Sequence, residues 1–364
     1  MMALFLSLLL FSSLNVVNAR PPHSIAVKSP GFSPESLSWD DSGQHFVIAS
    51  PIHATVLTLS DAGILQSLIS DPDFAGKSSL SSLALDGKNQ RLVALFVNSS
   101  SPFLASYDLK SRNQRLFVAP LAGKLTEKFS GQVAVDSLGN AYVTNPTGHL
   151  IWKINPNGEV NLLSQSYLFS SPKISEKKEE IAENSKEIAR KIEEIDGKSE
   201  AIDGIYAIAY SRKGYLLVAH MITGDIFRVD CDDGTVNRVL LSKNLDGIKG
   251  FAVRRDGALV AVTKTFVWLL MSNDNWAEAV VKERVEVKGG EITAVTLRGN
   301  ERVYVLKVGV EREGFFEVDE MVFEEEREGE NIWVFVLLGL ALIYVFYWRF
   351  QMGQLMQNMN KKKN

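Results

Sequence analysis

A phrase of about forty-three residues recurs along this chain and limits its fold more than any single motif does. Each copy holds a short run of alternating apolar and polar residues, a polar turn that ends on Gly or Asn, and a second alternating run. The clearest copies lie at 37–50, 133–145, 208–220 and 251–263. Repetition at this period is typical of stacked β-units, and a four-stranded propeller blade has about this length. The sequence therefore predicts an all-β fold of the β-propeller class.

The turns between the first two strands of each copy count the blades. They fall at Gly43, Asn89, Gly139, Gly214, Gly257 and Gly299. This count predicts a six-bladed β-propeller over residues 20–325, with five or seven blades as alternatives. The last copy supplies about three strands. We expect the early segment 24–27 to complete the last blade and close the ring, because an open sheet edge invites pairing.

One gap between turns is unusually long, and it holds a charged segment at 173–201. This segment predicts a helical insertion between blades 3 and 4. Ile181, Ile188, Ile192 and Ile195 form a narrow apolar stripe on a helix of about five turns. One interpretation is a solvated helix that rests on the propeller face. The other is a helix that binds a partner or a second copy, although the stripe spans too few heptads to establish a coiled coil.

The start of the chain, residues 1–19, is typical of a cleaved secretory signal. An apolar run covers 3–14, and small side chains at 17–19 suit cleavage before Arg20. A signal anchor is the alternative, but the run is too short to cross about 30 Å of hydrocarbon.

The end of the chain predicts a transmembrane helix at 332–348, which carries no charge and has aromatic residues near both edges. An acidic juxtamembrane linker precedes it at 326–331, and a basic tail follows at 349–364. The excess of positive charge after the span places the tail in the cytosol and the propeller on the lumenal or external side. The sequence thus predicts a single-pass membrane protein.

Lys361 and Lys362 lie fourth and third from the C-terminus. This resembles the dilysine retrieval signal that the coat-protein machinery reads on cytosolic tails, which implies the endoplasmic reticulum membrane with a lumenal propeller. The alternative is a basic anchor against anionic lipid, in another secretory-pathway membrane or the plasma membrane. Asn98 begins a glycosylation sequon on a predicted hairpin tip. The single cysteine, Cys231, excludes an intrachain disulfide. A net charge of −4 gives no support for a nucleic-acid partner.

Three segments, 34–40, 139–151 and 214–227, resemble the gluconolactonase/senescence-marker-protein family and NHL-repeat propellers, and more distantly the strictosidine-synthase-like proteins. The likeness covers most of residues 25–325. It implies a six-bladed propeller that in some members is a hydrolase or lyase and in others a binding protein. In the hydrolytic members a calcium ion in the central channel polarises a lactone or phosphoester oxygen, and carboxylates and amides at the starts of the innermost strands hold it.

Counting eight residues back from each turn gives the positions in this chain that correspond to those ligands. They are Glu35, Ser81, Gly131, Tyr206, Lys249 and Glu291. Glu35 matches the acidic ligand of the family's first blade. The others do not form a cage for calcium, because Gly131 offers no side chain and Lys249 places a positive charge beside the metal.

Two Asp-Gly pairs offer further oxygen ligands for calcium, since both precede their turn glycine by the same distance. If their loops are longer by three residues, Asp203 and Asp246 join Glu35 around the channel. The alternative for both pairs is ordinary turn chemistry. Asn145 and His220 end the second strands of blades 3 and 4 and are candidates to line the same channel, with a structural role as the alternative for His220.

Two functions therefore compete. In the first, the propeller is a binding module for a small molecule or a lumenal protein. In the second, it is a calcium-dependent hydrolase of the lactonase or phosphotriesterase type, with Ca²⁺ as the only cofactor implied. The sequence favours binding because of Gly131 and Lys249, and it identifies no catalytic residue. A serine-hydrolase elbow, a phosphate loop and a dinucleotide fingerprint are all missing from it.

Overall fold

The computed structural model describes residues 22–51, 54–98, 101–111, 114–121, 129–170, 204–299, 301–309 and 314–361. The chain divides into two compact units. One is His23–Met321, and the other contains helix α3 (Glu324–Lys361). The predicted signal at 1–19 and the predicted helical insertion at 173–201 lie outside the described residues.

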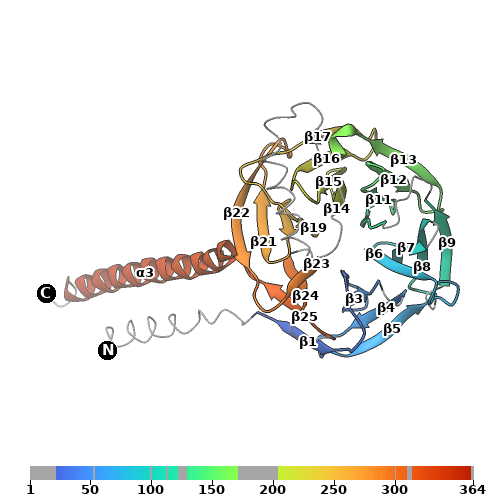
Figure 1. Ribbon diagram of the computed structural model, residues 1–364. Coiled ribbons are helices and arrows are strands. Elements are labelled where there is room, and N and C mark those ends of the chain that lie inside the picture. The colour runs from blue at the N-terminus through green and yellow to red at the C-terminus, as the bar shows by residue number, and fades with distance from the viewer. Residues whose placement is uncertain are drawn as a thin grey trace. The chain divides into compact units, whose positions relative to one another are not determined.

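The described strands of His23–Met321 form six sheets that are arranged as blades around a central axis, which confirms the predicted six-bladed propeller (Figure 1). Blade 1 consists of β2 (Ser36–Asp40), β3 (His45–Ala49), β4 (Thr55–Leu59) and β5 (Leu65–Ser70). Blade 2 consists of β6 (Ser78–Asp86), β7 (Arg91–Asn98), β8 (Pro102–Asp108) and β9 (Gln114–Pro120). Blade 3 consists of β10 (Val133–Val135), β11 (Ala141–Asn145), β12 (Leu150–Ile154) and β13 (Val160–Gln165).

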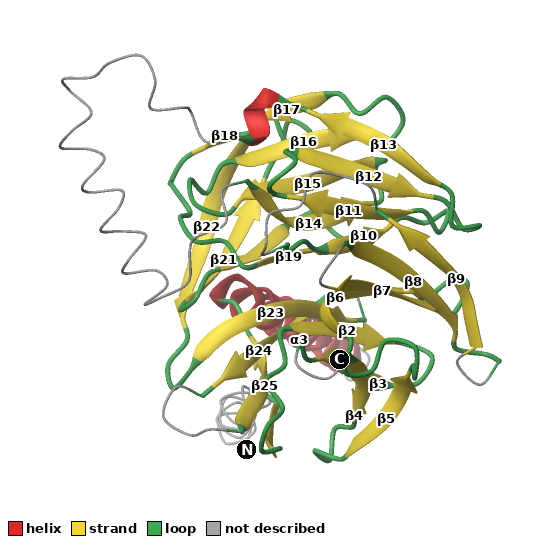
Figure 2. Cartoon of the chain, turned by 45° about the vertical axis from the view of Figure 1, so that its right-hand side comes forward, coloured by secondary structure: helices red, strands yellow, loops and turns green. Residues whose placement is uncertain are grey.

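The second half of the ring follows the same pattern. Blade 4 consists of β14 (Ile205–Ser211), β15 (Tyr215–His220), β16 (Ile226–Asp230) and β17 (Val236–Arg238). Blade 5 consists of β19 (Gly250–Val253), β20 (Leu259–Val262), β21 (Phe266–Met271) and β22 (Glu278–Glu286), with β18 (Leu240–Leu241) on its outer edge. Blade 6 consists of β23 (Glu291–Arg298), β24 (Arg302–Val308), β25 (Phe315–Met321) and β1 (Ser24–Lys28). Among the described residues, the only helices are η1 (Tyr167–Phe169), which follows β13, and α3 (Figure 2).

The early strand β1 closes the ring, as the sequence predicts. It pairs antiparallel with β25, from Ser24 opposite Asp319 to Lys28 opposite Phe315. Ile25 and Val27 are buried while their neighbours in β1 are exposed, as the alternation of strand side chains requires. The inner strands also contact one another in a closed cycle, in the order β2, β6, β10, β14, β19, β23 and back to β2. The last blade is therefore built from both ends of the propeller sequence.

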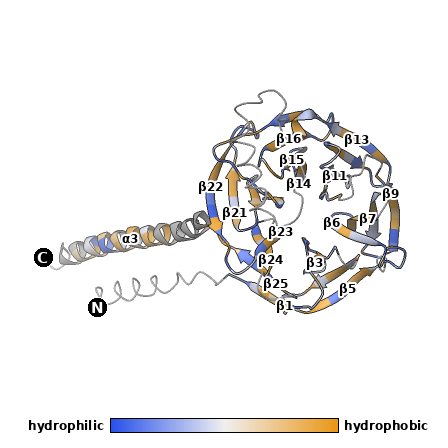
Figure 3. Ribbon diagram, viewed as in Figure 1, coloured by the Kyte–Doolittle hydropathy of each residue, from blue (hydrophilic) through white to orange (hydrophobic). Residues whose placement is uncertain are grey.

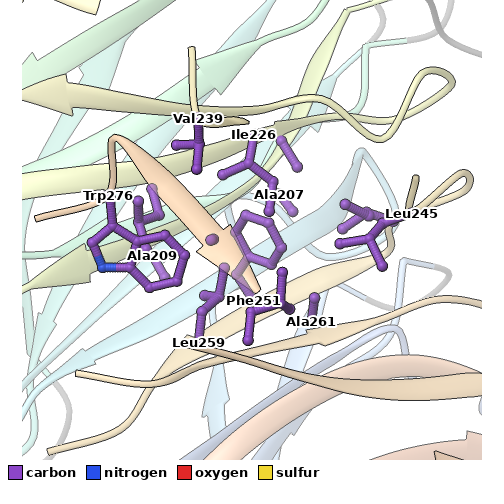
Figure 4. Close-up of a cluster of buried hydrophobic side chains, with 14 of the residues drawn as sticks. Ala207, Ala209, Ile226, Val239, Leu245, Phe251, Leu259, Ala261 and Trp276 are labelled. Atoms are coloured by element: carbon purple, nitrogen blue, oxygen red, sulfur yellow. The ribbon is translucent and has the colours of Figure 1, made fainter. Parts of the chain in front are cut away.

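Apolar layers between neighbouring blades hold the ring together. In the layer between blades 4 and 5, Ala207 and Ile226 pack with Phe251, Leu259 and Trp276 (Figure 4). Equivalent clusters join blades 1 and 2, 2 and 3, 3 and 4, and 6 and 1. Each buried square ångström of apolar surface contributes about 25 cal/mol, so these layers account for the stability of a fold without disulfides.

The edge strand β18 is a feature that the sequence pattern does not predict. It follows β17 of blade 4 but pairs in parallel with β22 of blade 5, with Leu240 opposite Glu278 and Leu241 opposite Ala279. The short strand covers part of an outer sheet edge, which reduces the exposed hydrogen-bonding groups there.

Helix α3 contains one stretch, Val336–Met356, that is long and apolar enough to cross a membrane by length and composition. Its large side chains, among them Leu337, Ile343 and Phe346, are exposed, and apolar residues follow the helix along this stretch (Figure 3). This stretch overlaps the predicted span, 332–348, over residues 336–348. The backbone is continuous helix through the predicted linker at 326–331.

Candidate functional site

Six residues lie at the N-terminal ends of the inner strands, and we call them the channel ring. In each blade, the pairing of the first two strands defines the last paired residue of the inner strand before the first turn. The ring member lies five residues before that residue. The channel ring consists of Glu35, Ser81, Gly131, Tyr206, Lys249 and Thr293. The strand register corrects the sixth predicted position from Glu291 to Thr293. Glu291 instead forms an ion pair with Lys264, with 2.6 Å between Oε1 and Nζ.

Hydroxyl groups near the channel ring connect neighbouring blades. Ser81 Oγ donates to the carbonyl oxygen of Gly131 at 2.9 Å, and Thr144 Oγ1 donates to that of Tyr206 at 2.9 Å. Thr293 Oγ1 donates to the carbonyl oxygen of Pro34, next to Glu35, at 3.2 Å. These hydroxyls satisfy backbone oxygens where the inner strands begin, so their first role is to fix the spacing of the blades.

The inner strands of alternate blades are irregular at the channel ring. The ladder between the first two strands shifts register at Ser81 in blade 2, at Tyr206 and Ala207 in blade 4, and at Thr293 in blade 6. Such bulges turn a side chain out of the regular alternation, and they are common next to functional sites. Three of the six ring side chains are therefore re-aimed by bulges.

Three ring members from different blades interact electrostatically. Burial between the channel walls raises the pKa of Glu35, and the positive charge of Lys249 partly offsets this effect. Burial also raises the pKa of Tyr206, an effect that hydrogen bonds from Ser130 and Gln132 reduce and the charge of Glu35 increases. Glu35, Tyr206 and Lys249 thus bring an acid, a phenol and an ammonium group to one end of the channel.

Gln132 connects two blades that are not neighbours. Its Nε2 donates to the carbonyl oxygen of Lys249 at 2.7 Å, which joins blade 3 to blade 5. The sequence analysis missed this residue, because its role depends on a contact between blades. The available signal was a long polar side chain at the start of an otherwise apolar inner strand.

The inner strands enclose a cavity of about 620 Å³, which we call the channel cavity. Residues of all six inner strands line it. Glu35 and Gln132 lie at one end, and the first turns of blades 2, 4 and 5 lie at the other. Ligand sites in proteins commonly occupy about 300–1,000 Å³, so the channel cavity has the size of a small-molecule site.

Comparison with solved structures agrees with this architecture. The major allergen Mala s 1 of Malassezia sympodialis superposes with a TM-score of 0.60 at 15% identity, over 82% of this chain and 96% of that chain. A gluconolactonase of Xanthomonas campestris gives 0.56 at 16%, over 83% and 90%. A virginiamycin B lyase of Staphylococcus aureus gives 0.51 at 9%, over 82% and 99%. The likeness is one of fold. No protein-family model and no curated protein sequence matches the chain.

The predicted calcium ligands are only partly within the described residues. Glu35 belongs to the channel ring, whereas Asp203 lies outside the described residues. Asp246 is exposed in a loop that packs on the hairpin after β15, where Gly247 N donates to the carbonyl oxygen of Met221 at 3.0 Å. The described part of the chain contains no group of three His, Cys, Asp or Glu side chains that could hold a metal ion.

The chemistry of the channel ring also does not suit calcium. A calcium ion takes about six to eight oxygen ligands. The ring supplies one carboxylate, Glu35, one glycine without a side chain, Gly131, and one cation, Lys249. Lys249 adds a positive charge that interacts with Glu35 and repels a second cation. The ring residues therefore do not fit the ion that the family resemblance implies.

Asn145 and His220 are buried at the ends of β11 and β15. Asn145 Oδ1 accepts hydrogen bonds from Thr147 Oγ1 at 3.0 Å and from Gly148 N at 2.9 Å. His220 Nδ1 accepts one from Thr223 N at 3.3 Å. Both side chains therefore stabilise their own hairpins, and neither is among the described residues that line the channel cavity. Their role in lining the channel stays a prediction.

The predicted glycosylation residue is not among the residues that line the channel cavity. Asn98 ends β7, and its Oδ1 accepts a hydrogen bond from Ser101 N at 2.7 Å. Lys361 is the last residue of α3, and Lys362 lies outside the described residues.

Proposed function

We propose that this protein is a single-pass membrane protein whose non-cytosolic propeller binds a small polar molecule in the channel cavity. The observation that carries the proposal is that Lys249 belongs to the same channel ring as Glu35, where its positive charge partly offsets the effect of burial on the Glu35 pKa. The protein itself supplies the cation that a bound metal supplies in a metal-dependent propeller. The channel can then bind an organic ligand without a metal ion.

The ring predicts the chemistry of that ligand. The Lys249 ammonium donates hydrogen bonds and suits a carbonyl or an anionic oxygen. The Glu35 carboxylate accepts them and suits a hydroxyl or an amine, while the Tyr206 hydroxyl can do either. Of these three groups only Glu35 is among the residues that line the channel cavity. A molecule that carries both donors and acceptors therefore satisfies all three only where it extends past the cavity into the channel ring.

The second candidate is a calcium-dependent hydrolase of the lactonase or phosphotriesterase type, with Glu35, Asp203 and Asp246 as ligands. Its support is the fold shared with a gluconolactonase and the acidic residue at the first ring position. The misfit of Lys249 and Gly131 with a calcium cage speaks against it, so we derive no catalytic step through a metal.

Calcium binding separates the two candidates. We expect calcium and a chelator to leave the melting temperature of the full chain in detergent unchanged. We expect Lys249→Glu to gain a calcium-dependent rise, because it places a second carboxylate beside Glu35. The matched control is Lys282→Glu, which makes the same charge change at an exposed site on β22. Calcium stabilisation of the wild type that is lost in Glu35→Gln would reverse the choice in favour of the hydrolase.

The proposed location is the endoplasmic reticulum membrane, with the coat-protein machinery as a partner through the tail. Support comes from the apolar stretch of α3, the acidic residues before it and the basic residues after it. In cells, the double variant Lys361→Ser with Lys362→Ser should leave the endoplasmic reticulum. The wild-type chain should carry a glycan that the variant Asn98→Gln lacks, which would indicate that the propeller lies in the lumen. A wild-type chain without that glycan, or a tail variant that stays in place, contradicts the respective part of the proposal.

A further inference from the structure

The channel cavity has a second charged region at the end opposite Glu35. There the lining includes residues of the first turns or of the strand ends beside them, at 40–41, 86–88, 136–137, 211–213 and 253–257. We call this end the turn mouth. Four of its five basic side chains come from neighbouring blades, Arg212 and Lys213 from blade 4 and Arg254 and Arg255 from blade 5, and the fifth, Lys88, comes from blade 2.

The acidic residues of the turn mouth are engaged within their own blades. Asp86 Oδ2 accepts from Arg91 Nη2 at 2.8 Å, and Asp136 Oδ2 accepts from Tyr142 Oη at 2.9 Å. Asp40 and Asp41 of blade 1 accept hydrogen bonds from Ser42 and Trp39, respectively. Asp256 pairs with Arg254 at 3.2 Å. These carboxylates hold their own turns, and none of them forms an ion pair with the basic side chains of blade 4.

Three basic residues of blades 4 and 5 have no acidic partner among the described residues. Arg212, Lys213 and Arg255 are exposed, and no carboxylate of the described residues lies within ion-pairing distance of them. They occupy adjacent turns and line one cavity. The side of the turn mouth formed by blades 4 and 5 therefore carries an excess of positive charge, while the aspartates of blades 1 to 3 lie on the other side. A basic patch attracts ligands of opposite charge, and guanidinium groups bind carboxylate or phosphate oxygens in pairs.

We propose that the turn mouth binds the anionic group of a small organic ligand, a carboxylate or a phosphate, through Arg212, Lys213 and Arg255. The uncharged part of the ligand then extends along the inner strands toward Glu35. This inference rests on the proposed function, since it takes the channel cavity as the ligand site, and it adds the charge of the ligand and the end that recognises it.

Three probes with the same three-carbon body test the charge preference. Glycerol is neutral, glycerate carries a carboxylate and glycerol 3-phosphate carries a phosphate. We expect titration of the full chain in detergent, followed by NMR of the ligands, to show that at least one of the two anions binds about tenfold or more tightly than glycerol. A comparison of the two anions distinguishes the carboxylate from the phosphate.

Variants locate the preference. The triple variant Arg212→Gln, Lys213→Gln, Arg255→Gln should reduce the affinity for the anions to that for glycerol. The matched control Lys77→Gln, Lys110→Gln, Lys282→Gln changes the net charge equally at exposed sites outside the channel cavity and should keep the preference. All substituted residues are exposed, so both triple variants should melt like the wild type.

The outcomes separate this inference from the proposed function. If neither anion binds more tightly than glycerol, or both triple variants lose the preference alike, the turn mouth is not the anion site. If Lys249→Met weakens all three probes while the turn variants change nothing, the channel binds ligands but the inference is wrong. If the turn variants abolish anion binding and Lys249→Met has no effect, the anion binds at the turn mouth and the proposed role of the channel ring fails.

Discussion

The two ends of the inner strands differ in how strictly the blades repeat. At the first turns of blades 1, 2 and 3, the same residue type recurs as Asp40, Asp86 and Asp136. Each accepts a hydrogen bond from a backbone N–H of its own turn, at 2.8–3.1 Å. At the opposite ends, the six members of the channel ring are six different residue types.

This difference follows from what each end has to do. The turns of blades 1 to 3 present similar backbone N–H groups, and the same residue type, aspartate, accepts from them each time. The channel ring faces a shared space, where a ring of identical residues would suit only a symmetric ligand. Five different side chains and one glycine, with one side chain acidic and one basic, suit an asymmetric organic molecule. The comparison therefore assigns stability to the turn aspartates of blades 1 to 3, whereas the channel ring is suited to ligand selectivity.

The largest expected effect tests the structural role of the turns. Asp86→Ala removes the buried partner of Arg91, whose Nη2 lies 2.8 Å from Asp86 Oδ2, and leaves a buried charge unpaired. We expect a loss of about 3–5 kcal/mol in the free energy of unfolding. Chemical denaturation of the full chain in detergent, followed by tryptophan fluorescence, measures it.

The double variant Asp86→Leu with Arg91→Met is the control, because it removes both charges and should lose much less. Acid should also narrow the gap between the wild type and Asp86→Ala. Burial raises the pKa of Asp86, but hydrogen bonds from Asn89 and Arg91 outweigh this and hold the pKa below 3.8. The stabilisation is therefore present above that pH and is lost as the pH falls through the lowered value. Equal stability of Asp86→Ala and the wild type would show that this turn carboxylate does not stabilise the fold.

A smaller effect is expected at the ring position without a side chain. A Cβ at Gly131 would fall against the backbone oxygen of Thr144 and within 3.1 Å of the Phe129 ring. We expect Gly131→Ala to cost about 1–3 kcal/mol, because the adjoining strands must move apart. Gly87→Ala is the control, since a Cβ there meets nothing within 4 Å, and its effect should stay within about 0.5 kcal/mol. A neutral Gly131→Ala would mean that this ring position is open to a larger side chain.

The sequence predicts the fold well because the turns repeat. Five of the six ring positions also follow by counting back from them. The count fails in blade 6, where Gly299 directly follows the last paired residue of the inner strand, Arg298. In blade 4 the turn glycine, Gly214, comes at the end of the turn, just before Tyr215. A glycine can serve either position, and only the strand register tells them apart.

The chemistry of the site was harder to predict because it depends on contacts between blades. The hydrogen bond from Gln132 to Lys249 joins positions 117 residues apart. The bulges at Ser81 and Thr293 depend on strand pairing, which the amino-acid composition does not reveal. The charge of Lys249 in the ring, by contrast, was visible from spacing alone.

The smallest expected effect tests whether the channel ring contains a group, Glu35, that lowers the stability of the fold at neutral pH. Burial raises the pKa of Glu35 above its ordinary value of 4.5 in spite of Lys249, so the ionised form is disfavoured in the folded channel. The contribution of this group to stability is present below pH 4.5 and is lost as the pH rises through its folded pKa. At neutral pH, Glu35→Gln should therefore raise the melting temperature slightly, and below pH 4.5 the gain should vanish.

Glu291→Gln gives the matched control, since it changes the same residue type two positions from the ring. Glu291 is 41% exposed and pairs with Lys264, so its substitution should lower stability by at most about 1 kcal/mol at neutral pH. A higher melting temperature for Glu35→Gln together with a lower one for Glu291→Gln would show that the folded channel disfavours the ionised form of Glu35. A structural carboxylate such as Asp86 is instead favoured in its ionised form. A lower melting temperature for Glu35→Gln at neutral pH would mean that attraction to Lys249 outweighs burial. The pair would then belong with the stabilising contacts of the turns, and the contrast between the two ends would fail.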